Sequence, residues 1–133
     1  MKSRARQTQA KAGKRTRKRP EQALQRAVFQ HVDARSARNS FTFHVPNGGK
    51  RSKVEAAILA GLGVKAGVPD ILAVKAGRLC CLELKSSKGR LSKAQRETIA
   101  ALKAAGCIVA AANSLDDAIG HLERWGILRG RLQ

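Results

Sequence analysis

The pattern of apolar and polar positions predicts eight elements of secondary structure. Segments with apolar residues at helical spacing alternate with short runs that are apolar at every second position or throughout. Serines stand where helix N-caps are expected, and glycines follow several elements where the chain must turn. The predicted order is α-β-α-β-β-α-β-α: helix 21–37, strand 41–45, helix 52–59, strands 70–75 and 79–85, a helix capped by Ser92 that ends near Gly106, strand 107–111 and a helix capped by Ser114.

This order of elements predicts a mixed α/β domain with a central sheet of about four strands flanked by helices. A length of 133 residues suits one domain. We expect the domain at residues 20–126, a disordered arm at residues 1–19 and a C-terminal tail at residues 127–133. No apolar run approaches the ~18–20 residues that span a bilayer, which excludes a membrane protein.

The charge of the chain indicates a nucleic-acid partner. Lys and Arg number 27 against 9 Asp and Glu, for a net charge of +18. Residues 1–19 hold nine of these cations and no acid, so we expect the arm to contact phosphates. A nuclear or organellar address remains an alternative for the arm. Three cysteines fit neither disulfide nor zinc spacing, which favours a reducing, cytoplasmic location.

The nine carboxylates are few enough to consider one by one. Six are explained as helix caps, first-turn acids or exposed helix charges: Asp33, Glu55, Glu97, Asp116, Asp117 and Glu123. Glu21, Asp70 and Glu83 have no such simple explanation and are the candidates for chemistry.

Asp70 and Glu83 are predicted to meet at one end of a β-hairpin. Side chains alternate along a strand, so Glu83 and Lys85 share the face opposite to their apolar neighbours, and Asp70 begins the adjacent strand. Two carboxylates this close repel unless a hard cation such as Mg²⁺ neutralises them. Lys85 would orient or deprotonate an attacking water, or stabilise charge on phosphorus. The alternative is a surface Glu–Lys pair beside an aspartate in a turn.

Polar residues on inward helix faces favour a functional site at Asp70 and Glu83 over a surface ion pair. Glu21 and Gln25 fall on the apolar face of the first helix, and Gln95 is in register with the apolar residues of its own helix. Polar groups on such faces must be paired or functional. The alternatives are a helix-dipole role for Glu21 and a capping box between Gln95 and Ser92.

Together, these residues resemble the virus-type replication-repair nuclease (VRR-NUC) domain, a branch of the PD-(D/E)xK, restriction-endonuclease-like superfamily. The similarity covers roughly residues 20–125. The matching pieces are Glu21 with Gln25, Pro46-Asn47-Gly48-Gly49, Gly67-Val68-Pro69-Asp70, Glu83-Leu84-Lys85, and Gly89-Arg90-Leu91-Ser92 with Gln95.

The resemblance implies a restriction-endonuclease-like fold and a Mg²⁺- or Mn²⁺-dependent endodeoxyribonuclease. It implies metal ligation by Asp70, Glu83 and the Leu84 carbonyl, with Lys85 as the catalytic lysine. It also implies supporting roles for Glu21 and Gln95. Stand-alone members resemble phage proteins that act as homodimers on branched DNA such as four-way junctions. The long basic arm departs from that family pattern.

We therefore expect a structure-specific DNA endonuclease. The predicted DNA-contacting residues are Asn47, Lys50, Arg51, Lys65, Lys88 and Arg90. His44 is a further candidate to border the cleft, whereas His31 and His121 are expected to be solvated. The alternative function is a non-catalytic basic nucleic-acid-binding protein, for which two carboxylates at the phosphate site are unfavourable because they repel DNA.

Overall fold

A computed structural model describes residues 20–46 and 51–130 of the chain. The predicted order α-β-α-β-β-α-β-α is confirmed, and so is the mixed four-stranded sheet. The first helix covers residues 20–35. The other elements are β1 (Ser40–Phe43), α2 (Lys53–Gly61), β2 (Ile71–Lys75), β3 (Arg78–Leu84), α3 (Lys93–Ala104), β4 (Ile108–Ala112) and α4 (Leu115–Arg124).

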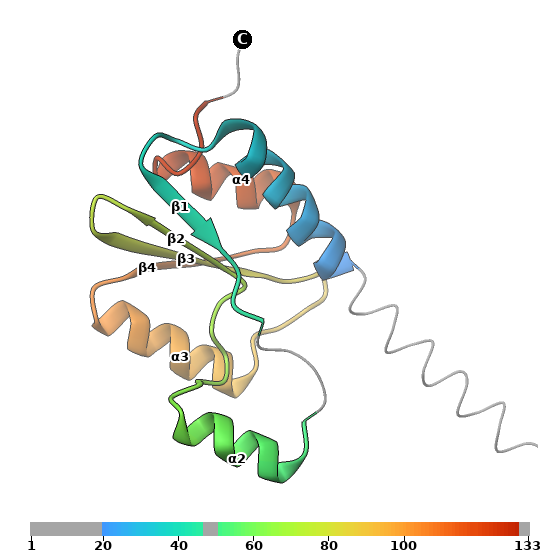
Figure 1. Cartoon of the computed structure of the whole chain (residues 1–133). Helices are drawn as coiled ribbons and strands as arrows, with labels where there is room; N and C mark the ends of the chain where they lie inside the picture. Colours follow the sequence, from blue (N-terminus) through green and yellow to red (C-terminus); the bar gives the residue numbers. More distant parts are fainter. Residues whose placement is uncertain (1–19, 47–50, 131–133) are drawn as a thin grey trace, which may run out of the picture.

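The sheet has the strand order β1-β2-β3-β4 and separates two layers of helices (Figure 1). β1, β2 and β3 are antiparallel neighbours, and β4 runs parallel to β3 after the α3 crossover. On one face, Leu82 and Leu84 pack with Val28 of the first helix and with Ile119 of α4. On the other face, Cys81 belongs to the smaller cluster that packs against α3. Alternation along β3 therefore directs Glu83 toward α3.

Each predicted serine cap is present. The side chains of Ser52, Ser92 and Ser114 each accept a hydrogen bond from a backbone N–H three residues later, at 3.1 Å. After α3, Gly106 adopts a φ of +96°, the left-handed conformation expected of a glycine that ends a helix. The local sequence thus determines where these helices begin and end.

The packed domain extends beyond the boundary that we predicted at residue 126. Ile127 and Leu128 are buried, and residues 127–129 run back beside the end of the first helix. Arg35 pairs with Glu123 at 3.4 Å and also donates to the Arg129 carbonyl. The expectation that Glu123 is an exposed helix charge is therefore wrong, because α4 packs beside the first helix and brings the two charges together.

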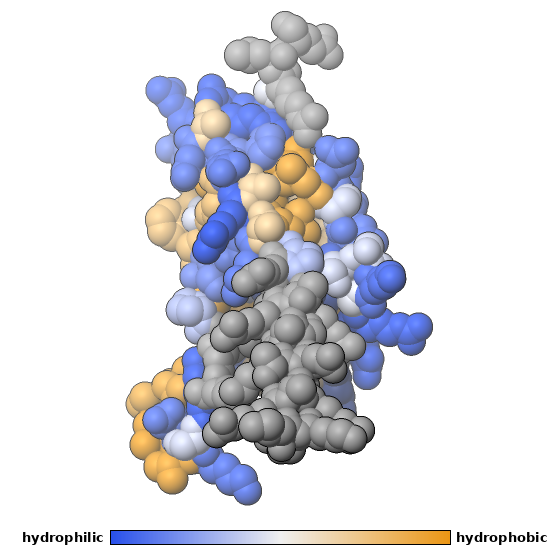
Figure 2. Space-filling view, turned by 90° about the vertical axis from the view of Figure 1, so that its right-hand side faces the viewer, coloured by the Kyte–Doolittle hydropathy of each residue, from blue (hydrophilic) through white to orange (hydrophobic). Residues whose placement is uncertain are grey.

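α2 lies apart from the two packed layers (Figure 1). It has no buried residue, and Val54, Ile58 and Leu62 are 70%, 58% and 77% exposed. These side chains form an apolar patch at the lower end of the molecule (Figure 2). No helix within residues 20–46 and 51–130 has the length and apolar character needed to span a bilayer.

Candidate active site

Asp70 and Glu83 lie side by side because of the register of the β2–β3 hairpin. Ile71 pairs with Leu82, so the residue before β2 falls opposite the residue after Leu82. The adjacent β4 pairs its last two residues with Glu83 and Leu84. The sheet therefore gathers Asp70, Glu83 and the segment after β4 at one edge, as the sequence predicted for the two carboxylates.

Glu83 is the buried carboxylate of this site, with 2% of its surface exposed. Its Oε1 accepts a hydrogen bond of 2.8 Å from Gln95 Nε2 and lies 3.8 Å from Lys85 Nζ. Its Oε2 is buried and has no hydrogen-bond partner among the described residues. The alternative of a surface Glu–Lys pair is wrong, because a solvated pair leaves its carboxylate in water.

Burial raises the pKa of Glu83 to about 8, and the neighbouring charge of Asp70 acts in the same direction. The Lys85 ammonium opposes this shift without cancelling it. A protonated Glu83 can donate to the Asp70 carboxylate, whereas an ionised Glu83 leaves Oε2 without a donor. Glu83 thus favours its protonated form when nothing else neutralises its charge.

Asp70 is held from two sides. Its Oδ2 accepts a hydrogen bond of 2.8 Å from the backbone N–H of Leu84. Its backbone carbonyl lies 2.6 Å from His44 Nδ1, a geometry in which the imidazole donates. Neither bond neutralises the carboxylate charge fully, but together they hold Asp70 facing the end of β3.

Glu21 and Gln95 both reach the edge that carries the two carboxylates. Glu21 Oε1 accepts a hydrogen bond from Ser86 N at 3.3 Å and so links the first helix to the loop after β3. Gln95 serves both roles that the sequence left open: its Oε1 accepts from Ser92 N in a capping box, while its Nε2 holds Glu83. The Gln25 side chain is half-buried and makes no hydrogen bond to a described residue.

The donor set fits a hard divalent cation. Two facing carboxylates and a buried, unpaired carboxylate oxygen are ligands that Mg²⁺ and Mn²⁺ take, with waters completing the shell. Leu84 directly follows Glu83, and its backbone N–H donates to Asp70, so the Leu84 peptide connects the two acids. No cluster of three or more His, Cys, Asp or Glu side chains arranged for a metal occurs in the described part of the chain.

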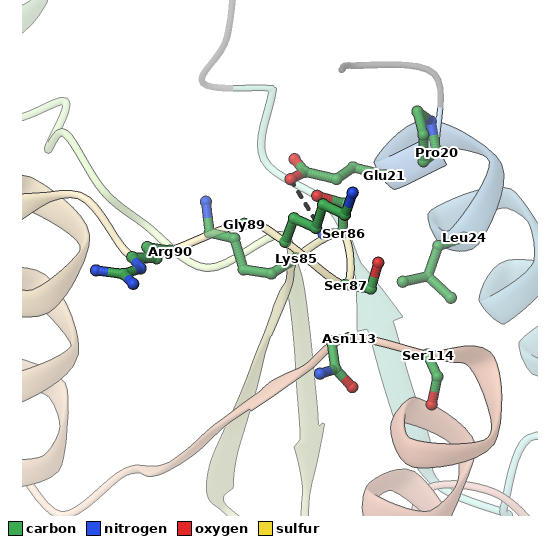
Figure 3. A pocket seen from close by; sticks show the side chains of 11 residues that line it. Pro20, Glu21, Leu24, Lys85, Ser86, Ser87, Gly89, Arg90, Asn113 and Ser114 are labelled. Atoms are coloured by element: carbon green, nitrogen blue, oxygen red, sulfur yellow. Dashed lines mark hydrogen bonds between the residues drawn. The ribbon is translucent and has the colours of Figure 1, made fainter. Parts of the chain in front are cut away.

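A cleft of about 840 Å³ lies beside Lys85, at the end of β3 (Figure 3). Its walls are the first turn of the helix 20–35, residues 85–90 after β3, and residues 113–114 between β4 and α4. Lys88 and Arg90, two of the residues that we predicted to contact DNA, line this cleft and are exposed; their contact with DNA stays a prediction. Arg51 and Lys65 are also exposed but flank α2 instead, and Asn47 and Lys50 lie outside the described residues.

The structure gives three residues of the site a position or contact that the sequence pattern does not predict. Asn113 lines the cleft because β4 is parallel to β3, which places the residue after β4 beside Lys85. His44 was a candidate to border the cleft, yet its contact with the Asp70 carbonyl was not foreseen. Gly67 approaches α3 so closely that an added Cβ would lie 2.4 Å from the Ala94 carbonyl oxygen.

Comparison with known proteins agrees with the fold and the motif order. The family model of the VRR-NUC domain matches residues 18–116. A solved structure described as a "VRR_NUC domain protein" superposes with a TM-score of 0.60 at 24% identity, covering 79% of this chain and 86% of that chain. That likeness shows a shared restriction-endonuclease-like α/β fold. No curated protein sequence matches the chain. With the family model covering most of its length, the chain belongs to the VRR-NUC nuclease family.

Proposed function

We propose that the protein is a Mg²⁺- or Mn²⁺-dependent endodeoxyribonuclease that cuts branched DNA such as four-way junctions, as a homodimer. The observation that carries this proposal is the Asp70–Glu83 pair, in which a buried carboxylate oxygen lacks a donor beside a second carboxylate. A protein that only binds DNA gains nothing from such a pair, because unneutralised carboxylates repel phosphate.

Asp70, Glu83 and the Leu84 carbonyl are the proposed metal ligands. A divalent cation bound there supplies positive charge to the phosphoryl oxygens and favours deprotonation of water. Lys85, whose Nζ lies 3.8 Å from Glu83 Oε1, orients or deprotonates the attacking water or stabilises charge on phosphorus. Gln95 and Glu21 are positioning residues that hold Glu83 and the loop after β3.

The DNA part of the proposal is supported by charge. The chain carries +18, and Lys88 and Arg90 line the same cleft as Lys85 without an ion-pair partner among the described residues. The arm joins the domain at Pro20, which lies on the rim of the same cleft. The cations that line this cleft favour the approach of a phosphate backbone.

The homodimer part is supported by α2. Val54, Ile58 and Leu62 are spaced four residues apart, so they form one stripe along the helix. In an antiparallel pair about a two-fold axis at Ile58, Val54 of one copy meets Leu62 of the other. From Ala56 to Val64 the sequence carries no charge, so two cationic chains approach here without opposing cations. A two-fold dimer presents two sites to two strands of a junction.

The test of catalysis is cleavage of labelled four-way junctions and linear duplexes by purified protein with Mg²⁺, with Mn²⁺ and with EDTA. We expect metal-dependent cuts that favour the junction and fall at least about a hundredfold in Glu83→Gln and Asp70→Asn. Glu97→Gln is the matched control, because Glu97 is an exposed helix residue paired with Lys93. Metal-dependent cleavage that survives both site variants would contradict the assignment.

The same variants separate the nuclease from a non-catalytic binding protein. A metal site couples Mg²⁺ to DNA affinity, and Glu83→Gln should remove that coupling. A simple binding module shows only salt competition, unchanged by Glu83→Gln.

The homodimer is tested by sedimentation velocity. Ile58→Glu places a charge at the centre of the α2 stripe and should give monomers, whereas Ala56→Glu places the same charge on the other side of the exposed helix. A dimer in Ile58→Glu would show that α2 is not the interface.

A further inference from the structure

The cleft beside the catalytic edge has walls of different chemistry. The loop after β3 contributes the cations Lys85, Lys88 and Arg90, the first helix contributes the apolar Leu24, and the segment after β4 contributes Asn113 (Figure 3). Such a combination suits a ligand with an anionic group, an apolar face and a polar edge. A nucleotide has all three.

Asn113 is the specific feature of this cleft. It lines the cavity, is exposed, and its side-chain amide makes no hydrogen bond to a described residue. The neighbouring Ser114 is already engaged, since its Oγ accepts from Asp117 N as the cap of α4. Asn113 therefore presents a free donor and a free acceptor, the pair of groups with which an amide side chain contacts a base edge.

Glu21 is the carboxylate that lines the cleft, and it does not oppose a phosphate strongly. Glu21 Oε1 accepts a hydrogen bond from the backbone N–H of Ser86. This bond partly compensates the negative charge of the Glu21 carboxylate. Lys85, Lys88 and Arg90 outnumber it three to one among the lining residues. The net field in the cleft thus favours an anion.

We propose that this cleft binds one unpaired nucleotide of the DNA strand next to the scissile phosphate. The proposal rests on the proposed nuclease function, which supplies the identity of the ligand as DNA. Lys88 and Arg90 hold the nucleotide's phosphate, Leu24 contacts the base face and Asn113 contacts its polar edge. A cleft of about 840 Å³ has room for this ligand.

A base within a duplex does not offer its face and its Watson–Crick edge together, because the faces are stacked and that edge is paired. Only a base that has left the stack can reach Leu24 and Asn113. The cleft therefore gives a physical reason for a preference for branched DNA, where unpaired nucleotides arise at the branch. This selection does not depend on aromatic stacking platforms, and no aromatic side chain is among the described residues that line the cleft.

The test compares two labelled DNAs, a nicked duplex with a single-nucleotide flap and the same nicked duplex without it. Dissociation constants are measured by fluorescence anisotropy in EDTA, so that cleavage does not interfere. The full-length protein should bind the flap DNA about tenfold more tightly. In Asn113→Asp, which places a carboxylate in the cleft, the ratio of the two constants should fall to about one.

Two further variants make the result specific. Asn113→Ala removes the side-chain amide without adding charge. It must also lower the ratio of the dissociation constants of the two DNAs. Asn39→Asp makes the same chemical change at an exposed residue before β1, at the end of the sheet opposite to Asp70, and should keep the wild-type ratio. The proposal is overturned if either Asn113 variant keeps the wild-type ratio, or if Asn39→Asp loses it.

Cleavage is measured on the same two DNAs with Mg²⁺, which separates the two proposals. Discrimination in binding without any cleavage would keep the nucleotide site and overturn only the nuclease. Metal-dependent cleavage by a protein that binds both DNAs equally would keep the nuclease and overturn the nucleotide site.

Discussion

The side-chain amide of Gln95 donates to Glu83 at 2.8 Å, while the same residue closes the capping box of α3 with Ser92. The N-terminus of a helix and the buried acid of the site are thus joined through one side chain. Stability of α3 and orientation of Glu83 depend on different atoms of Gln95, so mutations can separate them.

Gln95→Leu should reduce cleavage about tenfold or more, because Glu83 loses the donor that orients it. Ser92→Ala is the matched control, since it breaks the other half of the capping box without touching Glu83. Both variants should lose about 1 kcal/mol of stability through the cap. Melting temperature and cleavage rate are measured for each, and equal rates in the two variants would show that Gln95 acts only as a cap.

The metal-free protein should become less stable as the pH rises from about 4.5 to about 8. The pKa of Glu83 is raised from its ordinary value of 4.5 to about 8, so the native state keeps a proton that the unfolded chain releases in this window. Protonated Glu83 contributes its full stabilisation of the folded state below the pKa that Glu83 has in the unfolded chain. This contribution is lost as the pH rises through the pKa that Glu83 has in the folded protein.

This pH effect is measured as the difference in unfolding free energy between the wild type and Glu83→Gln in EDTA. Glu83→Gln removes the titrating group, so the difference should change by on the order of a few kcal/mol across the window. Adding Mg²⁺ should raise the melting temperature of the wild type most at the alkaline end, where Glu83 is ionised. Parallel pH profiles for the two proteins would contradict the prediction.

Gly67→Ala should destabilise the domain by about 3 kcal/mol or more and reduce cleavage as well. Gly67 has a φ of +79°, and an added Cβ would lie 2.4 Å from the Ala94 carbonyl oxygen and 2.7 Å from Gln95 N. The clash displaces the first turn of α3, which carries the residue that holds Glu83. Chemical denaturation and cleavage rates check both effects.

Gly63→Ala is the control for Gly67. Gly63 also has a positive φ, of +98°, but nothing lies within 4 Å of an added Cβ. The Gly63→Ala variant should therefore lose only about 1–2 kcal/mol of unfolding free energy, because of the unfavourable backbone conformation, and should keep its activity. A loss in Gly63→Ala as large as that in Gly67→Ala would mean that the contact with α3 is unimportant.

Deletion of residues 1–19 should weaken DNA binding and flatten its dependence on salt. The segment carries nine Lys and Arg, and each phosphate contact contributes about −0.9 to the slope of log affinity against log salt. Affinity is measured over a series of salt concentrations for the full chain and the deletion. An unchanged slope would show that the arm makes no phosphate contact.

Much of the local structure follows from the sequence alone because the signals are local. Serine caps at 52, 92 and 114 begin their helices, and the short turn at Ala76 and Gly77 sets the hairpin register that brings Asp70 beside Glu83. The helix boundary at residue 37 and the domain boundary at residue 126 were less accurate. Contacts between residues 35–37 and 127–129 are long-range, and no local pattern encodes them.

The sequence by itself determined the order of elements, the separation of charge into an arm and a domain, and the acids without a simple local role. Only the tertiary structure decided that Glu83 is buried with one oxygen unpaired and that Asn113 faces a cleft. It also decided that Gln95 both caps α3 and donates a hydrogen bond to Glu83. The physical reason is distance along the chain. Caps and alternation depend on residues a few positions apart, whereas burial, pKa and cavities depend on segments that meet only when the sheet has formed.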